Sequence, residues 1–245
     1  MRIALVSDIH GNLSALEAVA ADIRRRGVDQ VLCLGDNLSG PLLPRETAQW
    51  LMASGWPVLA GNHERQILEW TPETGGASDG HALAALGTAE LDWVRSLRSE
   101  WAWAPGIFLC HGTPRSDCEH FLETPENGVL RLASAAEIDE RLAGRSSALI
   151  ACGHSHLPRA LRLATGQLVV NPGSVGLQAY VDDEPERYVV ERGTPDAHYA
   201  IVEQVDGAWH CSQLSLPYAH QAMAELAQRN GRPEWARALL GGRVA

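Results

Sequence analysis

The chain has 245 residues, of which 45% are hydrophobic and 20% are charged, an ordinary composition for a globular protein. Its formal net charge is -10, which argues against a nucleic-acid coat and against a protein of the membrane surface. An anionic substrate is not excluded, because bound metal ions can reverse the local sign of the electrostatic field.

Five cysteines are present, at positions 33, 110, 118, 152 and 211. Their number is odd and their spacing gives no CxxC pair, so a reducing compartment is expected. The N-terminus lacks the pattern of a signal peptide, and no apolar run approaches membrane length. We therefore expect a cytoplasmic protein with no membrane partner.

The first sixty residues alternate between apolar runs and amphipathic segments, which predicts an α/β layer fold with parallel strands. Asn12 can cap a helix that Gly27 ends, and a second helix is expected near residues 45–54. The predicted strands are residues 2–7, 30–34 and 56–60.

Residues 64–104 have a different composition, with tryptophans and alanines around the loop TPETGGASDG. We expect two helices with a flexible connection here, as a helical insertion. Two further strands are predicted at residues 106–110 and 147–152, and Ser134 and Glu137 form a capping box for a short helix between them.

The last third of the chain predicts two hairpins, with turns at Thr165-Gly166 and Asp206-Gly207. We assign both to a mixed second sheet and expect a helical tail over residues 220–240. The whole chain, residues 1–245, is read as a single domain. The predicted architecture is an α/β sandwich of two mixed sheets that face each other, with helices outside.

Five short motifs follow strand ends and carry residues that can bind metals. They are SDIHGN (7–12), LGDN (34–37), AGNHE (60–64), CHG (110–112) and CGHSH (152–156). Ligands in open α/β sheets collect at the carboxyl ends of strands, so these loops can converge on one point. Carboxylate and imidazole together suit Mn, Fe, Zn or Ni.

Each motif alone has an ordinary explanation. Asp36 could be a turn residue, Asn62 and His63 could form a turn with an exposed histidine, and His111 could be a loop histidine. These explanations must all hold together to remove the site, which favours the functional interpretation of the ordered set.

The ordered set D-x-H, G-D, G-N-H-E, H-G and G-H-S-H resembles the calcineurin-like metallophosphoesterase superfamily. It is most similar to the small bacterial and archaeal phosphodiesterase branch, and NPGSV (171–175) is similar to a further element of that branch. The resemblance implies a four-layer α-β-β-α sandwich of two mixed sheets with flanking helices.

The resemblance also implies a role for each motif residue. The ligands expected for a first ion are Asp8, His10 and His156, those for a second ion are Asn62, His111 and His154, and Asp36 would bridge both. His63 would bind no metal and would act on the substrate, as an acid to the leaving oxygen or as a donor to the phosphoryl oxygens.

Two divalent ions about 3.5–4 Å apart can clamp the attacking and leaving oxygens of an in-line displacement, with a bridging hydroxide as nucleophile. We therefore predict metal-dependent hydrolysis of a phosphate ester. The preference for a diester rests on the resemblance alone. The expected partner is a small phosphorylated substrate, and nucleic acid is not expected.

One departure from the family pattern concerns the second motif. Phosphoprotein phosphatases of this superfamily extend it to G-D-x-x-D-R-G, whereas Ser39 and Gly40 stand here in place of Asp and Arg. The change removes a phosphate-binding arginine and the expected carboxylate partner of His63, so we discount a protein phosphatase. Arg65 and Arg115 follow ligand motifs closely and are candidates for a replacement clamp.

Two alternatives stay open. The substrate could be a nucleotide or a dinucleoside polyphosphate. Alternatively, the chain could be a protein-binding scaffold, like the retromer-type subunit of this fold, whose site is degraded. No ligand position is degraded here, which favours an enzyme.

Overall fold

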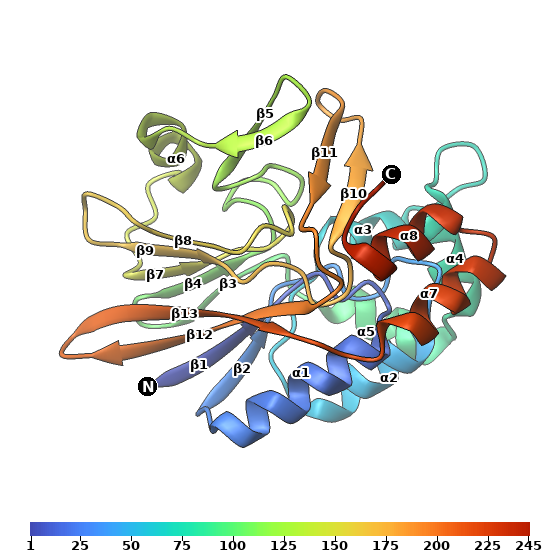
Figure 1. Ribbon diagram of the computed structural model, residues 1–245. Coiled ribbons are helices and arrows are strands. Elements are labelled where there is room, and N and C mark those ends of the chain that lie inside the picture. Colours follow the sequence, from blue (N-terminus) through green and yellow to red (C-terminus); the bar gives the residue numbers. More distant parts are fainter.

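The computed structural model describes residues 1–245 and places two β-sheets face to face, with helices on their outer sides (Figure 1). The first sheet has the strand order β13 (Ala208–Leu216), β12 (Ala197–Val205), β1 (Arg2–Val6) and β2 (Gln30–Cys33). The second has the order β3 (Glu100–Ala104), β4 (Ile107–Cys110), β7 (Leu149–Ala151), β9 (Leu168–Asn171) and β8 (Arg159–Arg162). Both sheets are mixed, which confirms the predicted sandwich.

The alternation of side chains along β1 explains why the two sheets face each other. Ile3 and Leu5 are fully buried on one face, in a core that also contains Leu109 of the second sheet. Val6 lies on the other face and packs in a separate core with Leu16 of the first helix. Burial of apolar surface on both faces therefore fixes the sheet between a helical layer and the other sheet.

The outer layers are formed by α1 (Leu13–Arg26) and α2 (Pro44–Ser54) on the first sheet and by α6 (Ala135–Leu142) on the second. The predicted caps are confirmed. The Asn12 side chain accepts a hydrogen bond from the backbone of Ala15, and Ser134 and Glu137 form the expected capping box of α6.

The helical insertion differs from its prediction. Three helices occur instead of two, α3 (Asn62–Leu68), α4 (Ala77–Ala85) and α5 (Thr88–Ser96), and α4 begins inside the loop expected to be flexible. A Cβ added at Gly75 or Gly80 would lie 2.1 or 2.8 Å from the Trp70 ring, whose Nε1 donates to the Gly76 carbonyl. These glycines make room for an aromatic ring and so order the segment.

Two strand predictions need correction. Residues 56–60 form no strand, because they meet their neighbours only at the single bridges Cys33–Val58 and Leu59–Arg98, and Pro57 has no N–H to extend the ladder. The two predicted hairpins exist, but only β8–β9 joins the second sheet. Strand β12 pairs antiparallel with β1 and so places the other hairpin in the first sheet.

Two short ribbons were not predicted, β5 (Glu123–Glu126) with β6 (Val129–Leu132) and β10 (Ala179–Asp182) with β11 (Tyr188–Glu191). The helical tail is divided into α7 (His220–Arg229) and α8 (Pro233–Gly241). The division follows from Gly231, whose φ is +74°, and from Pro233, which starts the second helix. No helix in the chain is long and apolar enough to cross a bilayer.

Candidate metal centre

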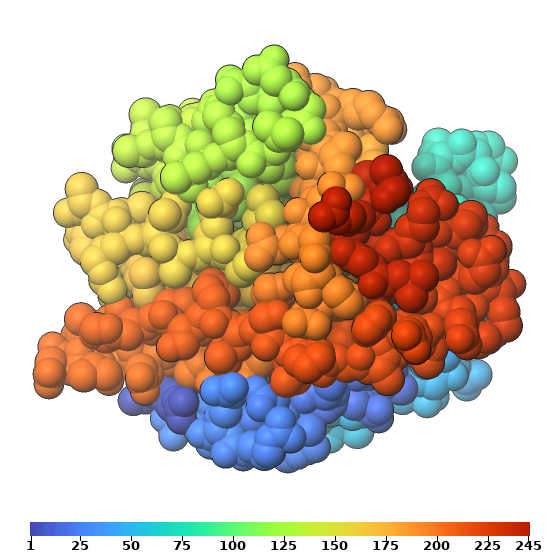
Figure 2. Space-filling model, in the orientation of Figure 1, coloured from blue at the N-terminus to red at the C-terminus, as the bar shows by residue number.

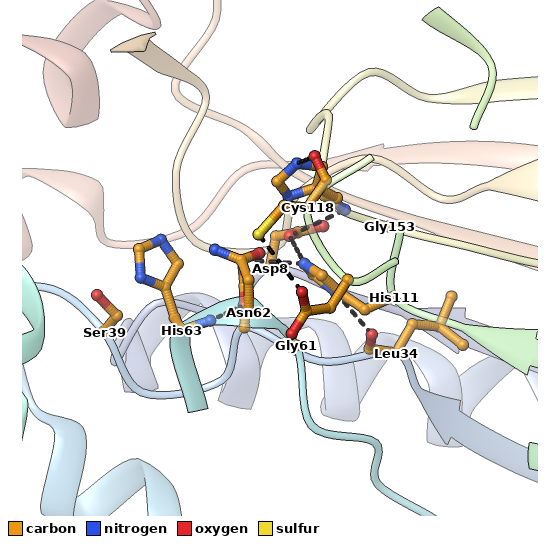
Figure 3. Close-up of polar contacts among 12 residues, drawn as sticks. Asp8, Leu34, Ser39, Gly61, Asn62, His63, His111, Cys118 and Gly153 are labelled. Atoms are coloured by element: carbon orange, nitrogen blue, oxygen red, sulfur yellow. Dashed lines mark hydrogen bonds and ion pairs between the residues drawn. The ribbon is translucent and has the colours of Figure 1, made fainter. Parts of the chain in front are cut away.

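The loops that carry the five motifs meet at one end of the facing sheets, and backbone hydrogen bonds join them in pairs (Figure 3). The N–H of Asp8 donates to the carbonyl of Gly35 at 3.0 Å, and the N–H of Gly153 donates to the carbonyl of His111 at 2.7 Å. Asp8 is completely buried and His111 is 1% exposed. The predicted convergence of loops from separate strand ends is therefore present.

The potential ligand atoms fall into two groups. Asp8, His10 and His156 place one ligand atom each within 4.8 Å of one another, and so do Asp36, His111 and His154. The structure thus brings together the histidines and carboxylates that were predicted for each ion. Asn62 adds a buried Oδ1 atom that has no hydrogen-bond partner, which suits a metal ligand.

The first group has a geometry that calls for a cation. The Nδ1 atoms of His10 and His156 each lie 2.8 Å from a backbone carbonyl, of Ser39 and Leu177 respectively, and must donate to it. Each Nε2 atom therefore carries a lone pair in the neutral ring, yet the two Nε2 atoms face each other at 3.1 Å. Two acceptors at this distance repel unless a positive ion binds both, and carbonyl-oriented imidazoles are typical of metal sites.

The second group is oriented in a similar way. Nδ1 of His111 donates to the carbonyl of Leu34 at 2.8 Å, which directs Nε2 to within 3.0 Å of an Asp36 carboxylate oxygen. Nε2 of His154 lies 3.0 Å from the carbonyl of Cys118, so Nδ1 is left as its ligand atom. The residues present fit a pair of divalent ions.

Burial and neighbouring charges shift the pKa values of the candidate ligands in different directions. Burial raises the pKa of Asp8 to about 7, and burial lowers the pKa of His10 to about 4. Burial also opposes a charged His111, but the carboxylates of Asp36 and Asp8 outweigh it and raise that pKa to about 10. Near neutral pH His10 is neutral, whereas His111 holds a proton that a metal ion must replace.

Five of the predicted ligands have a left-handed backbone, which sequence reasoning did not foresee. Their φ angles lie between +53° and +70°, and they are Asp8, His10, Asp36, His154 and His156. Only three other non-glycine residues of the chain share this conformation. Such residues are unfavourable by about 1–3 kcal/mol each and gather at functional sites. The turn directs each side chain towards the common centre directly after a strand.

Glu64, the last residue of the GNHE motif, holds two of these loops together. Its carboxylate, 1% exposed, accepts hydrogen bonds from the N–H groups of Asp36, Asn37 and Gly61 at 2.8–2.9 Å. A Cβ at Gly61 would lie 2.2 Å from Asp36 Oδ1, so only glycine permits this approach. A glutamate three residues after the cap is a capping-box signal that could have identified this role.

His63 belongs to neither ligand group and lies beside them with 27% of its side chain exposed (Figure 3). Its Nδ1 lies 2.8 Å from a carboxylate oxygen of Asp79, which is 4% exposed in the first turn of α4. Burial lowers the pKa of His63, but the charge of Asp36 and the hydrogen bond to Asp79 outweigh it and raise this pKa to about 9. The expected loss of a carboxylate partner was therefore wrong, because the insertion supplies one.

A cavity of about 510 Å³ opens beside the ligands. His10, Asp36, Asn62, His63, His154 and His156 line one side. The rings of Tyr180 and Trp235 lie close to those of His156 and His10, with centroids 4.7 and 5.9 Å apart. The rest of the lining comes from β10, α8 and adjoining residues, among them Tyr180, Arg232, Trp235 and Arg237. None of these four was a candidate from the sequence, because they carry no local motif and lie far along the chain.

The two arginines proposed as a phosphate clamp lie elsewhere. Arg65 forms two hydrogen bonds with the carboxylate of Asp117, at 2.8 and 2.9 Å, and Arg115 forms two with Glu119, at 2.7 and 2.6 Å. Neither guanidinium lines the cavity. Their role in substrate binding stays a prediction that this geometry does not favour.

Further side chains support the residues of the centre. The His120 ring stacks on His154 with centroids 4.6 Å apart. Within NPGSV, Asn171 donates to the carbonyl of Gly153 at 2.7 Å and Ser174 to that of Asp8 at 2.8 Å. These two side chains shape the turns beside the centre.

A sandwich of two mixed sheets, with paired histidine and carboxylate groups at the strand ends, defines the class of metal-dependent phosphoesterases. The model of the calcineurin-like phosphoesterase superfamily domain matches residues 1–207, and the chain belongs to this superfamily. The resemblance noted in the sequence is thereby confirmed. Membership supports the hydrolysis of phosphate esters with divalent metal ions.

Two relatives illustrate the similarity. An uncharacterized protein of Methanocaldococcus jannaschii is 24% identical in an alignment that covers 95% of this chain and 94% of that protein. A crystal structure of a metallophosphoesterase from Sphaerobacter thermophilus is 23% identical, with a TM-score of 0.77 over 99% of this chain and 100% of that one. The structural likeness shows the shared fold.

Proposed function

We propose that this chain is a phosphodiesterase that holds two divalent ions. The facing Nε2 atoms of His10 and His156, at 3.1 Å, are the observation that carries the proposal, because only a cation makes this contact favourable. The first ion would be held by Asp8, His10 and His156 and the second by Asn62, His111 and His154, and Asp36 would be shared between them. The donor set suits Mn, Fe, Zn or Ni.

When bound, two such ions supply an acidified water as nucleophile and neutralise the charge of the phosphoryl group. The protein's own residues manage the leaving group. As the bond from phosphorus to the leaving oxygen breaks and the water oxygen bonds to phosphorus, His63 delivers a proton to the leaving oxygen. Asp79 accepts from Nδ1 of His63, which leaves Nε2 for the substrate and stabilises the protonated ring.

The diester preference is supported by the size of the cavity, because about 510 Å³ accommodates groups on both sides of a phosphate. A second candidate is a nucleotide or dinucleoside polyphosphate hydrolase. It is favoured by Arg237, a cation of the cavity lining whose one polar contact is a bond of 3.4 Å to a backbone carbonyl.

We further propose that residues 1–245 act as one domain. In this proposal residues 64–104 complete the site instead of forming a separate unit, because α4 carries the partner of His63. All five cysteines are free, which supports a reducing, cytoplasmic environment.

The test is metal analysis combined with a phosphoester panel on the same preparation. The panel contains p-nitrophenyl phosphate, bis(p-nitrophenyl) phosphate, nucleotides and a dinucleoside polyphosphate. We expect about two ions per chain and fastest hydrolysis of the diester. Asp36→Asn should lose metal and turnover together, whereas the exposed Asp139→Asn on α6 should match the wild type. Two bound ions without hydrolysis of any ester would reject the proposal and favour a non-catalytic scaffold.

A further inference from the structure

One wall of the cavity is built by parts of the chain that carry none of the family motifs. Strand β10 and Leu177 just before it contribute to this wall, and the segment 232–244 contributes α8 and its flanks. The second segment lies beyond residues 1–207, the region that the superfamily shares. Figures 1 and 2 show this C-terminal segment packed beside the β10–β11 ribbon. The contacts that this wall offers therefore lie in part outside the region that the superfamily model matches.

Two guanidinium groups line the wall, and they differ in what they contact. Arg232 pairs with Glu234 through its Nε atom and donates from Nη1 to the Ser78 hydroxyl at 3.1 Å. It joins the start of α8 to α4, and a carboxylate already balances its charge. Arg237 has no carboxylate within 4.0 Å, and its one polar contact is a long bond of 3.4 Å from Nε to the carbonyl of Val244.

Two carboxylates share this wall with Arg237. Burial acts to raise the pKa of Glu234, but its pairing with Arg232 outweighs burial and lowers this pKa, and the charge of Arg237 contributes to the same shift. Asp182 accepts a hydrogen bond from the hydroxyl of Tyr188 at 3.0 Å and one from the backbone of Glu184 at 3.1 Å. Val181 and Ala238 also line the cavity and add apolar surface to it. An exposed arginine with no carboxylate within 4.0 Å, in such a lining and in a chain of net charge -10, suits a ligand that is apolar in part and carries an anion.

We propose that Arg237 forms a second anion subsite, which binds a phosphate group of the substrate other than the one held at the metal ligands. The substrate class is then an organic phosphate ester in which an apolar or aromatic frame links two phosphate groups. This inference rests on the proposed function, since it assumes that the first phosphate lies at the ligand side. Arg237 acts here in recognition and has no part in bond cleavage.

The test compares two ligands that differ only in the second anion. Hexylphosphonate and 1,6-hexanebisphosphonate have C–P bonds that hydrolysis of esters does not cleave, and both have the same flexible apolar frame. Their dissociation constants are measured by calorimetry on the metal-loaded protein. Arg237→Ala is expected to weaken the bisphosphonate about tenfold, the lower range for a hydrogen-bonded charge, and to change the monophosphonate less than twofold.

A matched control is Arg229→Ala on α7, whose side chain is 65% exposed and which does not line the cavity. It should leave both dissociation constants unchanged. Equal weakening of both ligands by Arg237→Ala, or no weakening of either, overturns the subsite. If the wild type cleaves phosphodiesters but the two ligands respond alike, the subsite fails and the proposed function stands. If no ester is cleaved and only the bisphosphonate responds, the proposed function fails and the anion subsite stands.

Discussion

Replacing Asp79 by asparagine tests whether α4 controls the proton on His63. The carboxylate lies 2.8 Å from Nδ1 and is 4% exposed, so water cannot take its place. Hydrogen bonds to charged groups contribute about 1.5–3 kcal/mol, and about 1.36 kcal/mol corresponds to tenfold in rate. If the pair acts in the transition state, kcat should fall about 10- to 150-fold. Asparagine can still accept through Oδ1, so it should lie at the lower end and alanine at the upper end.

The assay compares leaving groups. p-Nitrophenolate leaves easily without a proton, whereas phenolate depends more strongly on receiving one. Asp79→Asn should therefore slow the hydrolysis of diphenyl phosphate more than that of bis(p-nitrophenyl) phosphate. KM and metal content should stay near the wild-type values. Asp92→Asn on α5 is the control, since its side chain is 66% exposed and pairs only with Arg95. Equal losses for the two esters, or loss of metal, would show that Asp79 has only a structural role and would refute the reasoning.

Two further outcomes are expected. His63→Ala should keep the metal content of the wild type but slow turnover by about a hundredfold or more, because the residue is outside both ligand groups; loss of metal on elemental analysis would make it a ligand. Metal binding should release at least one proton near pH 7, because the pKa of His111 is raised to about 10 and that of Asp8 to about 7, and both protons must leave. Metal affinity should therefore rise with pH, and calorimetry in buffers of different ionisation heat counts the protons; a count of zero contradicts the assignment.

Most strands and the meeting of the motif loops could be predicted because their signals are local. The role of each ligand came from the family resemblance and stays a prediction. A short apolar run followed at once by Asp-x-His or Gly-Asp gives both the strand and the position of the loop at its end. The same local reasoning failed where pairing is distant. Both predicted hairpins alternate in the same way, and only the contact of β12 with β1, almost two hundred residues apart, decides their sheets. Residues 56–60 are apolar enough for a strand, but they meet neighbouring segments only at isolated bridges.

The parts of the site that were missed all depend on tertiary packing. Asp79 is a common residue in a glycine-rich stretch, and its value comes from the 2.8 Å contact that the docking of α4 creates. Arg237 likewise lines the cavity only because α8 packs beside it. Arg65, by contrast, had a suggestive position next to a ligand motif, but Asp117, fifty-two residues later, pairs with it.

The left-handed turns of the candidate ligands have an energetic cost for the fold. With five ligand residues in a left-handed backbone, the protein gives up on the order of 5 kcal/mol, which is close to the whole stability of some domains. Glycine would relieve that burden at every one of these positions if only the shape of the loop mattered. Imidazole and carboxylate side chains occupy these positions instead. Cations bound between them would offset the cost of the turns, whether the loaded protein acts as a catalyst or as a scaffold.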